Sequence, residues 1–251
     1  MSISILQALL LGVIYYLGNI GTPWTTVLGS ASIFQKPLVA GLLTGIVLGH
    51  PLEGLLIGAA IQLPYISYIS AGSTVPSDPG LAGVVGTCLA ICGGFDPLAA
   101  IAIGIPFGLV GTKIWVYHMT VDAKFVHKAD KAAEEGDLKK ICFYHVVPPQ
   151  LLMAAICITP VFLVTYFASP FMAQLAALLG AKGIHVLRTI GGVMPALSVA
   201  INLRAVNRPN TMAFYILGFA MTVFLGLEMT AVAVIGGVIA WFYTQSNKTA
   251  N

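Results

Sequence analysis

The sequence predicts an all-α integral membrane protein, a multi-span helical bundle with broken or re-entrant segments and two halves that resemble inverted repeats. Hydrophobic residues make up 58% of the chain and charged residues only 8%, whereas a soluble domain has about 25% charged residues. Several apolar runs are interrupted by glycine or proline, which is typical of transporters. A spaced pattern also occurs in both halves: Gly41, Gly49 and Glu53 in the first, and Gly218, Gly226 and Glu228 in the second.

Apolar runs of different lengths follow one another along the chain. In order, they cover residues 3–20, 38–49, 81–92, 98–117, 146–168, 171–179, 190–206, 213–226 and 230–243. A helix needs about 20 apolar residues to cross a bilayer. The runs at 3–20, 98–117 and 146–168 are therefore predicted to span. The runs at 38–49, 81–92 and 171–179 are too short to cross alone.

The stretch at residues 38–80 is the clearest example of a broken membrane segment. Gly41, Gly45 and Gly49 lie four apart, which would place three small residues on one helical face and let another helix approach closely. The stretch is interrupted after Gly49 and at Pro64, and it ends in a string rich in serine and proline. Non-helical backbone is tolerated at membrane depth only when protein buries it or it lines a wet cavity. This stretch is therefore the predicted transport site.

More than half of the charged side chains gather between residues 113 and 140. They are Lys113, Asp122, Lys124, Lys128, Asp130, Lys131, Glu134, Glu135, Asp137, Lys139 and Lys140. Their alternating signs, with Lys131 and Glu135 at i, i+4, predict a water-facing helix. Its lysines favour the cytoplasmic side, although it could equally be only a solvated connector. The predicted organisation is a membrane half at 1–112, a charged amphipathic connector at 113–145, a second membrane half at 146–244 and a polar tail at 245–251.

Asp78 is the strongest candidate for a ligand-binding side chain, because ionisable residues within apolar surroundings are usually functional. With Gln62 and the nearby serines it offers the acceptors and donors that a hydroxyl-rich ligand such as a sugar requires. Two structural alternatives stand beside this interpretation. Asp78 precedes Pro79 and could cap a helix, and Gln62 could join two helices. Glu53 and Glu228 lie at breaks between segments, where an interfacial position explains them adequately.

Other residue types give no pattern of a catalytic, metal or cofactor site. The histidines are scattered, and no Ser/His/Asp order, HExxH motif, Walker loop or GxGxxG motif occurs in the sequence. Cys88 and Cys92 lie at i, i+4 without a second pair at metal spacing, so buried thiols are favoured. Tyr65, Tyr68 and Trp24 could stack on a sugar ring, but core or interfacial packing explains them better. The net charge of +3 does not indicate nucleic-acid binding.

Six segments in the same order resemble one family over nearly the whole chain. They are SILQALLLG, QKPLVAGLLTGIVLGHPLEGLLIGAAIQ, GSTVPSDPGLA, HKADKAAEEGDLKK, and GGVMPAL followed by FYILGF. This set is similar to the IIC subunit, the permease, of the mannose/fructose/sorbose family of the bacterial sugar phosphotransferase system. The resemblance implies a multi-pass protein of the bacterial inner membrane, with two inverted domains, that binds and translocates a sugar.

The resemblance also implies partners and site residues. The family works in an oligomeric complex in the bilayer with a membrane subunit, IID, while soluble IIA and IIB subunits pass phosphate from phosphoenolpyruvate to the sugar. No phosphorylated residue and no cofactor would then be expected in this chain. By position, the sugar-site candidates are Gln62, Ser70, Gly72 and Asp78. Mannose-type members have Glu in place of Gln62 and Asn in place of Ser70, so the sugar stays open.

Two other functions fit the broken helices alone. One is an ion-coupled secondary transporter of a small polar solute, and the other is a membrane scaffold that transports nothing. A proton-driven carrier usually places carboxylates or histidines at mid-membrane, and here only Asp78 and Glu228 are plausible. The family resemblance therefore places the sugar permease first.

Overall fold

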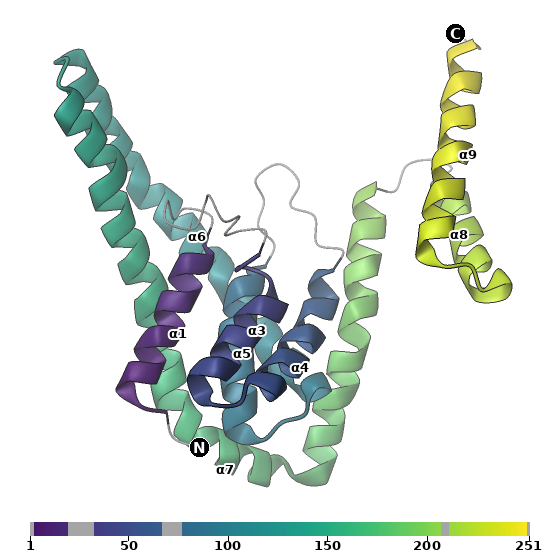
Figure 1. Cartoon of the computed structure of the whole chain (residues 1–251), viewed down its shortest axis with the longest axis horizontal. Helices are drawn as coiled ribbons and strands as arrows, with labels where there is room; N and C mark the ends of the chain where they lie inside the picture. The colour runs from purple at the N-terminus through teal and green to yellow at the C-terminus, as the bar shows by residue number, and fades with distance from the viewer. Residues whose placement is uncertain (1–2, 20–32, 67–76, 207–210, 250–251) are drawn as a thin grey trace. The chain divides into compact units, whose positions relative to one another are not determined.

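The computed structural model describes residues 3–19, 33–66, 77–206 and 211–249, and within these ranges the regular structure is helical throughout. The elements are α1 (Ile5–Gly18), α3 (Pro37–Leu48), α4 (Pro51–Gln62), the 3₁₀ turn η1 (Leu63–Tyr65), α5 (Pro79–Gly93), α6 (Pro97–Glu134), α7 (Leu138–Val206), α8 (Thr211–Leu225) and α9 (Met229–Thr249). They form two compact units, Met1–Val199 and Ala200–Asn251. In the first unit, the short helices α1, α3, α4 and α5 lie side by side (Figure 1).

Helix α1 begins with a capping box. The Ser4 hydroxyl accepts the N–H of Gln7 at 3.2 Å, and the Gln7 carboxamide oxygen accepts the N–H of Ser4 at 3.0 Å. This exchange satisfies two backbone donors that would otherwise have no partner at the start of the helix. The helix is 14 residues long, shorter than the predicted span at 3–20, whose last residue lies outside the described ranges.

Helices α3 and α4 form a hairpin with glycines along its seam. A Cβ atom on Gly41 would lie 2.6 Å from Gly58 Cα, and one on Gly45 would lie 2.8 Å from Gly54 Cα. The predicted close approach of a second helix is therefore confirmed for Gly41 and Gly45. Gly49 does not belong to this face. With φ of 82° it ends α3 in a left-handed turn, a conformation that glycine adopts without steric cost.

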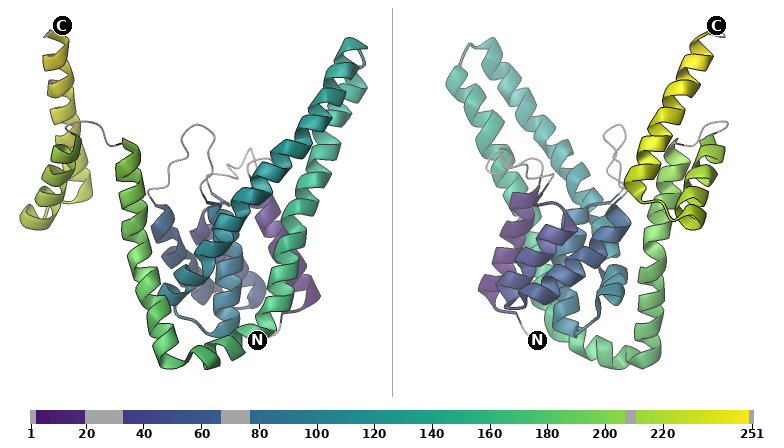
Figure 2. Two further views of the ribbon diagram at one scale, coloured as in Figure 1. Left: turned by 180° about the vertical axis from the view of Figure 1, so that it is seen from behind. Right: turned by 45° about the vertical axis from the view of Figure 1, so that its right-hand side comes forward.

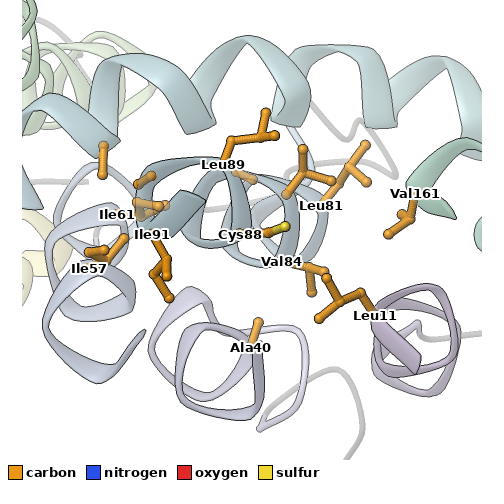
Figure 3. Packing of buried hydrophobic residues seen from close by; sticks show 14 of the residues in the cluster. Leu11, Ala40, Ile57, Ile61, Leu81, Val84, Cys88, Leu89, Ile91 and Val161 are labelled. Atoms are coloured by element: carbon orange, nitrogen blue, oxygen red, sulfur yellow. The ribbon is translucent and has the colours of Figure 1, made fainter. Parts of the chain in front are cut away.

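Helix α5 lies at the centre of the first unit. Every residue from Pro79 to Cys92 is buried, and α3, α4, α6 and α1 all contact the helix. Figure 3 shows Val84 of α5 beside Leu11 of α1 and Ala40 of α3, with Leu81 on the side of Val161 of α7. A helix that is apolar on all sides requires such an enclosed position.

Helices α6 and α7 are much longer than the spans predicted within them. Both are long and apolar enough to cross a membrane. The charged segment at 113–145 is not one separate helix, because it forms the distal part of α6, a turn at Gly136 and the start of α7. Helix α7 also continues through Pro148, Pro149 and Pro160, and a kink at Gly180, with φ of 56° and ψ of −172°, divides it into two helices. Neighbouring polar groups let membrane helices tolerate such prolines.

The second unit contains a helical hairpin, α8 and α9. Gly226, with φ of 63°, lies in the turn between the two helices. The spaced glycines of both halves thus correspond to hairpins whose turns contain a left-handed glycine. Helix breaks in both halves are confirmed, and the inverted relation between the halves stays a prediction.

Candidate functional site

Asp78 is buried at the N-terminus of α5, with 5% of its surface exposed. Its Oδ1 accepts the N–H of Leu81 at 3.0 Å, so the predicted helix cap is present. Its Oδ2 accepts the hydroxyl of Tyr15, on α1, at 2.6 Å. Its own N–H donates to the carbonyl oxygen of Gly108, on α6, at 2.8 Å. Asp78 therefore connects three helices while it caps one of them.

Two glycines on α6 leave the space that Asp78 and its neighbour Ser77 occupy. A Cβ atom on Gly111 would collide with Asp78 Cβ, and one on Gly108 would lie 2.7 Å from the Ser77 hydroxyl oxygen. Ser77 and Tyr65 are within hydrogen-bond distance of each other, at 3.0 Å. The missing side chains allow the backbone of α6 to lie directly against the segment that precedes α5. A carboxylate, a serine hydroxyl and two tyrosine hydroxyls are gathered here.

The α1 side of the site contacts α7. The Tyr16 hydroxyl donates to Gln150 Oε1 at 2.9 Å, and the Asn19 amide lies 3.8 Å from Cys157 Sγ. A narrow hollow beside Tyr15 is lined by Gly18, Asn19, Gln35 and Gly80. As the described residues form it, the hollow has no room for a water molecule. In this arrangement, the Tyr15 hydroxyl occupies Asp78 Oδ2, the acceptor to which a ligand hydroxyl could donate.

Of the other predicted site residues, Gln62 is the one that the structure describes, and its hydrogen bond is to α3 rather than to Asp78. Gln62 ends α4, and its Oε1 accepts the N–H of Leu38 at 3.5 Å, which is the long limit of a hydrogen bond. Gln62 thus lies across the hairpin from the start of α3, as the helix-joining alternative expects. Ser70 and Gly72 lie outside the described residues, as do Tyr68 and Trp24.

The structure also describes the surroundings of the remaining candidates. Glu53 is half-exposed in the first turn of α4, with its Oε2 3.3 Å from His50 Nδ1. Glu228 is exposed in the turn before α9. Tyr65 is buried and its hydroxyl reaches Ser77, next to Asp78, while Cys88 and Cys92 are buried on α5. Within the described ranges, no three His, Cys, Asp or Glu side chains lie close enough together to hold a metal ion.

Sequence reasoning missed Tyr15, Gly108 and Gly111. Tyr15 is 63 positions away from Asp78 in a run that reads as an ordinary apolar helix. The two glycines lie three apart in residues 98–117, and this spacing on one helical face was the available signal for close packing.

A comparison with known families decides the identity of the chain. The family model described as the sorbose-specific IIC component of the phosphotransferase system matches residues 5–242. The chain belongs to this family. It is a membrane permease subunit of a sugar phosphotransferase system, as the resemblance in the sequence predicted.

Individual relatives agree with this assignment. The mannose-specific EIIC component of Escherichia coli strain K12 is 29% identical over 218 residues, which cover 87% of this chain and 82% of the relative. Other relatives are named for sorbose, N-acetylgalactosamine and fructose. A solved structure titled "Structure of membrane protein" is 28% identical, has a TM-score of 0.76, and covers 97% of both chains.

A second solved structure is a complex of the mannose transporter ManYZ with microcin E492. The matched chain is 28% identical and has a TM-score of 0.59, with 98% of this chain and 97% of that chain covered. Together with the helical structure and the long apolar helices, these matches confirm the predicted class, an all-α integral membrane protein.

Proposed function

We propose that this subunit crosses the bacterial inner membrane several times and translocates a monosaccharide that binds at Asp78, with Gln62, Ser70 and Gly72 contributing. The observation that supports this site is a buried carboxylate bonded to α1, α5 and α6 at once. A sugar leaves water only where comparable hydrogen bonds replace those it loses. Asp78 Oδ2 provides such an acceptor when a sugar hydroxyl takes the place of the Tyr15 hydroxyl.

The proposed ligand is a hexose or a hexose derivative. Relatives of similar identity are named for mannose, sorbose, N-acetylgalactosamine and fructose, which share several hydroxyl groups on a small ring. Gln62 and Ser70, at which the chain departs from mannose-type members, are the residues that we expect to select among these sugars.

The proposed topology follows the charge distribution. The membrane halves at 1–112 and 146–244 are joined by the charged segment at 113–145, which lies in the cytoplasm, and the polar tail at 245–251 ends the chain. Lysine-rich segments next to membrane spans are retained on the cytoplasmic side.

The subunit acts in an oligomeric complex with a membrane subunit, IID, and soluble IIA and IIB subunits. The family assignment supports this proposal, and one matched chain of known structure is part of the mannose transporter complex ManYZ. The sugar would receive phosphate from IIB. Deleting the IID gene is expected to abolish sugar uptake. Uptake by the subunit without IID would favour an ion-coupled secondary transporter.

The replacement Asp78→Asn tests the binding site. Asparagine caps helices about as well as aspartate does, so the change removes the charge and largely keeps the cap. We expect uptake of radiolabelled sugar to be lost while the amount of protein in the membrane stays normal.

Asp96→Asn is the matched control. Asp96 also precedes a proline and caps a helix, and it accepts the N–H groups of Leu98 and Ala99 at the start of α6. The control should keep uptake. Normal uptake in Asp78→Asn would leave Asp78 with the capping role alone.

A further inference from the structure

The ends of α6 and α7 form an arm that projects from the first unit. We define the arm as residues 118–149, the distal part of α6 and the first turns of α7. In Figures 1 and 2 this teal hairpin extends beyond the short helices α1, α3, α4 and α5 in every view. Most side chains on its α6 part are exposed.

The length of α6 places the arm outside the bilayer. The helix has 38 residues, which corresponds to about 57 Å at 1.5 Å per residue, whereas the hydrocarbon core is about 30 Å thick. If the apolar run ends at Tyr117, Lys128 lies about 16 Å and Lys131 about 21 Å farther along the helix. These lysines are therefore beyond the lipid headgroups in an upright helix.

Most acidic side chains of the arm already have a basic partner. Lys140 Nζ lies 3.1 Å from Glu135 Oε2 and 3.3 Å from Asp137 Oδ2. The hydrogen bond to Glu135, and after it the one to Asp137, raises the pKa of Lys140 above its usual value. His118 Nε2 lies 2.9 Å from Asp122, and His127 Nδ1 lies 3.9 Å from Asp130. Glu135 thus pairs with Lys140, and the predicted Lys131–Glu135 pair is wrong.

Three exposed lysines on one face of α6 have no carboxylate partner among the described residues. Lys124, Lys128 and Lys131 have the i, i+4, i+7 spacing of a single helical face, and the described structure forms no ion pair with any of them. We call these residues the lysine stripe. Lys128 Nζ lies 5.8 Å from the centre of the Tyr144 ring on α7. An aromatic ring from the second helix is therefore next to the stripe.

The arm also exposes large apolar side chains where water is expected. Val126, Leu138 and Phe143 are 56%, 75% and 50% exposed. Phe143 packs edge-on against Tyr144, with 5.5 Å between the ring centres. Exposed aromatic and aliphatic groups beside unpaired positive charge are more typical of a protein interface than of a purely solvated connector.

We propose that the lysine stripe docks an acidic face of the soluble IIB subunit, which phosphorylates the sugar; this inference rests on the proposed function. The free lysines supply the charge, and Tyr144 and Phe143 supply the apolar contact. Anionic headgroups are the other ligand that lysines attract, but electrostatic attraction is screened over about 8 Å at physiological salt. The distance of Lys128 and Lys131 from the membrane therefore favours a soluble protein.

The test uses the whole chain with its IID partner in nanodiscs and the purified IIB subunit as the probe. Binding is measured for the wild type, for the triple variant Lys124→Glu, Lys128→Glu, Lys131→Glu, and for the control Lys36→Glu, Lys182→Glu. The control lysines are also exposed but lie off the arm. We expect the triple variant to weaken binding about tenfold or more and the control about twofold or less, and wild-type affinity to fall as salt rises.

Two results would overturn the proposal. The first is equal binding of IIB by the triple variant and the wild type. The second is dependence of IIB binding on anionic lipid in the nanodisc rather than on the lysines, which would assign the stripe to headgroups. Sugar binding to the same nanodiscs separates this question from the proposed function, because the triple variant should bind sugar as the wild type does. Loss of docking with intact sugar binding supports the stripe, and absence of sugar binding in the wild type counts against the sugar site itself.

Discussion

Replacing Tyr15 by phenylalanine tests the hydrogen bond that joins α1 to Asp78. The change removes only the hydroxyl, which donates to Asp78 Oδ2 across 2.6 Å. The ring should keep its place, because Tyr15 is 3% exposed and phenylalanine has the same shape without the hydroxyl. Asp78 Oδ1 keeps the N–H of Leu81. The change therefore removes the hydrogen bond to Asp78 Oδ2 and leaves the one to Oδ1 in place.

The size of the effect follows from the charge of the acceptor. A hydrogen bond to a charged group contributes about 1.5–3 kcal/mol and a neutral one about 0.5–1.5 kcal/mol. We expect Tyr15→Phe to lower the free energy of unfolding by about 2 kcal/mol. Tyr16→Phe is the matched control, since it removes a hydroxyl from the next residue of α1 whose partner, Gln150, is neutral. Its expected cost is about 1 kcal/mol.

A double-mutant cycle isolates the interaction from the effect of each residue alone. Tyr15→Phe, Asp78→Ala and the double variant are unfolded in detergent, and their free energies of unfolding are compared. Residues that share a hydrogen bond have a coupling energy of about 0.5–3 kcal/mol, and here we expect about 2 kcal/mol because both side chains are buried. Additive effects, with a coupling near zero, would refute the assignment of Tyr15 as the partner of Asp78.

Two further predictions concern the hairpin seam and the arm. Gly54→Ala would place a Cβ atom 2.5 Å from the carbonyl oxygen of Gly41. Helices α3 and α4 must then separate, which should lower the free energy of unfolding, measured by thermal unfolding, by about 1–3 kcal/mol. Gly236→Ala on α9 is the control, because no atom outside its own helix lies within 4 Å of the added Cβ, and equal effects of the two changes would contradict a tight seam. A Glu134→Cys variant in which exposed Cys142 is replaced by serine should react with a membrane-impermeant thiol reagent from the cytoplasmic side, and labelling from outside would invert the proposed topology.

Features set by neighbouring residues could be predicted from the sequence. The cap at Asp78 follows from aspartate before proline, and the close approach of α3 to α4 follows from glycines four apart. The role of Gly49 was misassigned because spacing cannot separate a glycine on a helix face from one that ends the helix. The runs at 146–168 and 171–179 were separated at Pro170, but the helix continues through it, because prolines that would break a helix in water are tolerated when surrounding polar groups compensate.

Features that depend on distant contacts could not be predicted. No local pattern connects Tyr15 to Asp78, because the contact arises only when α1 packs against α5. The pairing of Glu135 with Lys140 rather than Lys131 depends on the turn at Gly136, which brings the start of α7 back to the end of α6. In the candidate site, the sequence identified the acid and its cap but not the phenol that completes its hydrogen bonds.

The glycine seam between α3 and α4 also limits how this part of the protein can move. Two backbones in direct contact have no layer of side chains between them that could change rotamers or slide. The hairpin would then move as one rigid unit. A rearrangement that moves either helix to expose Asp78 would therefore shift α3 and α4 together.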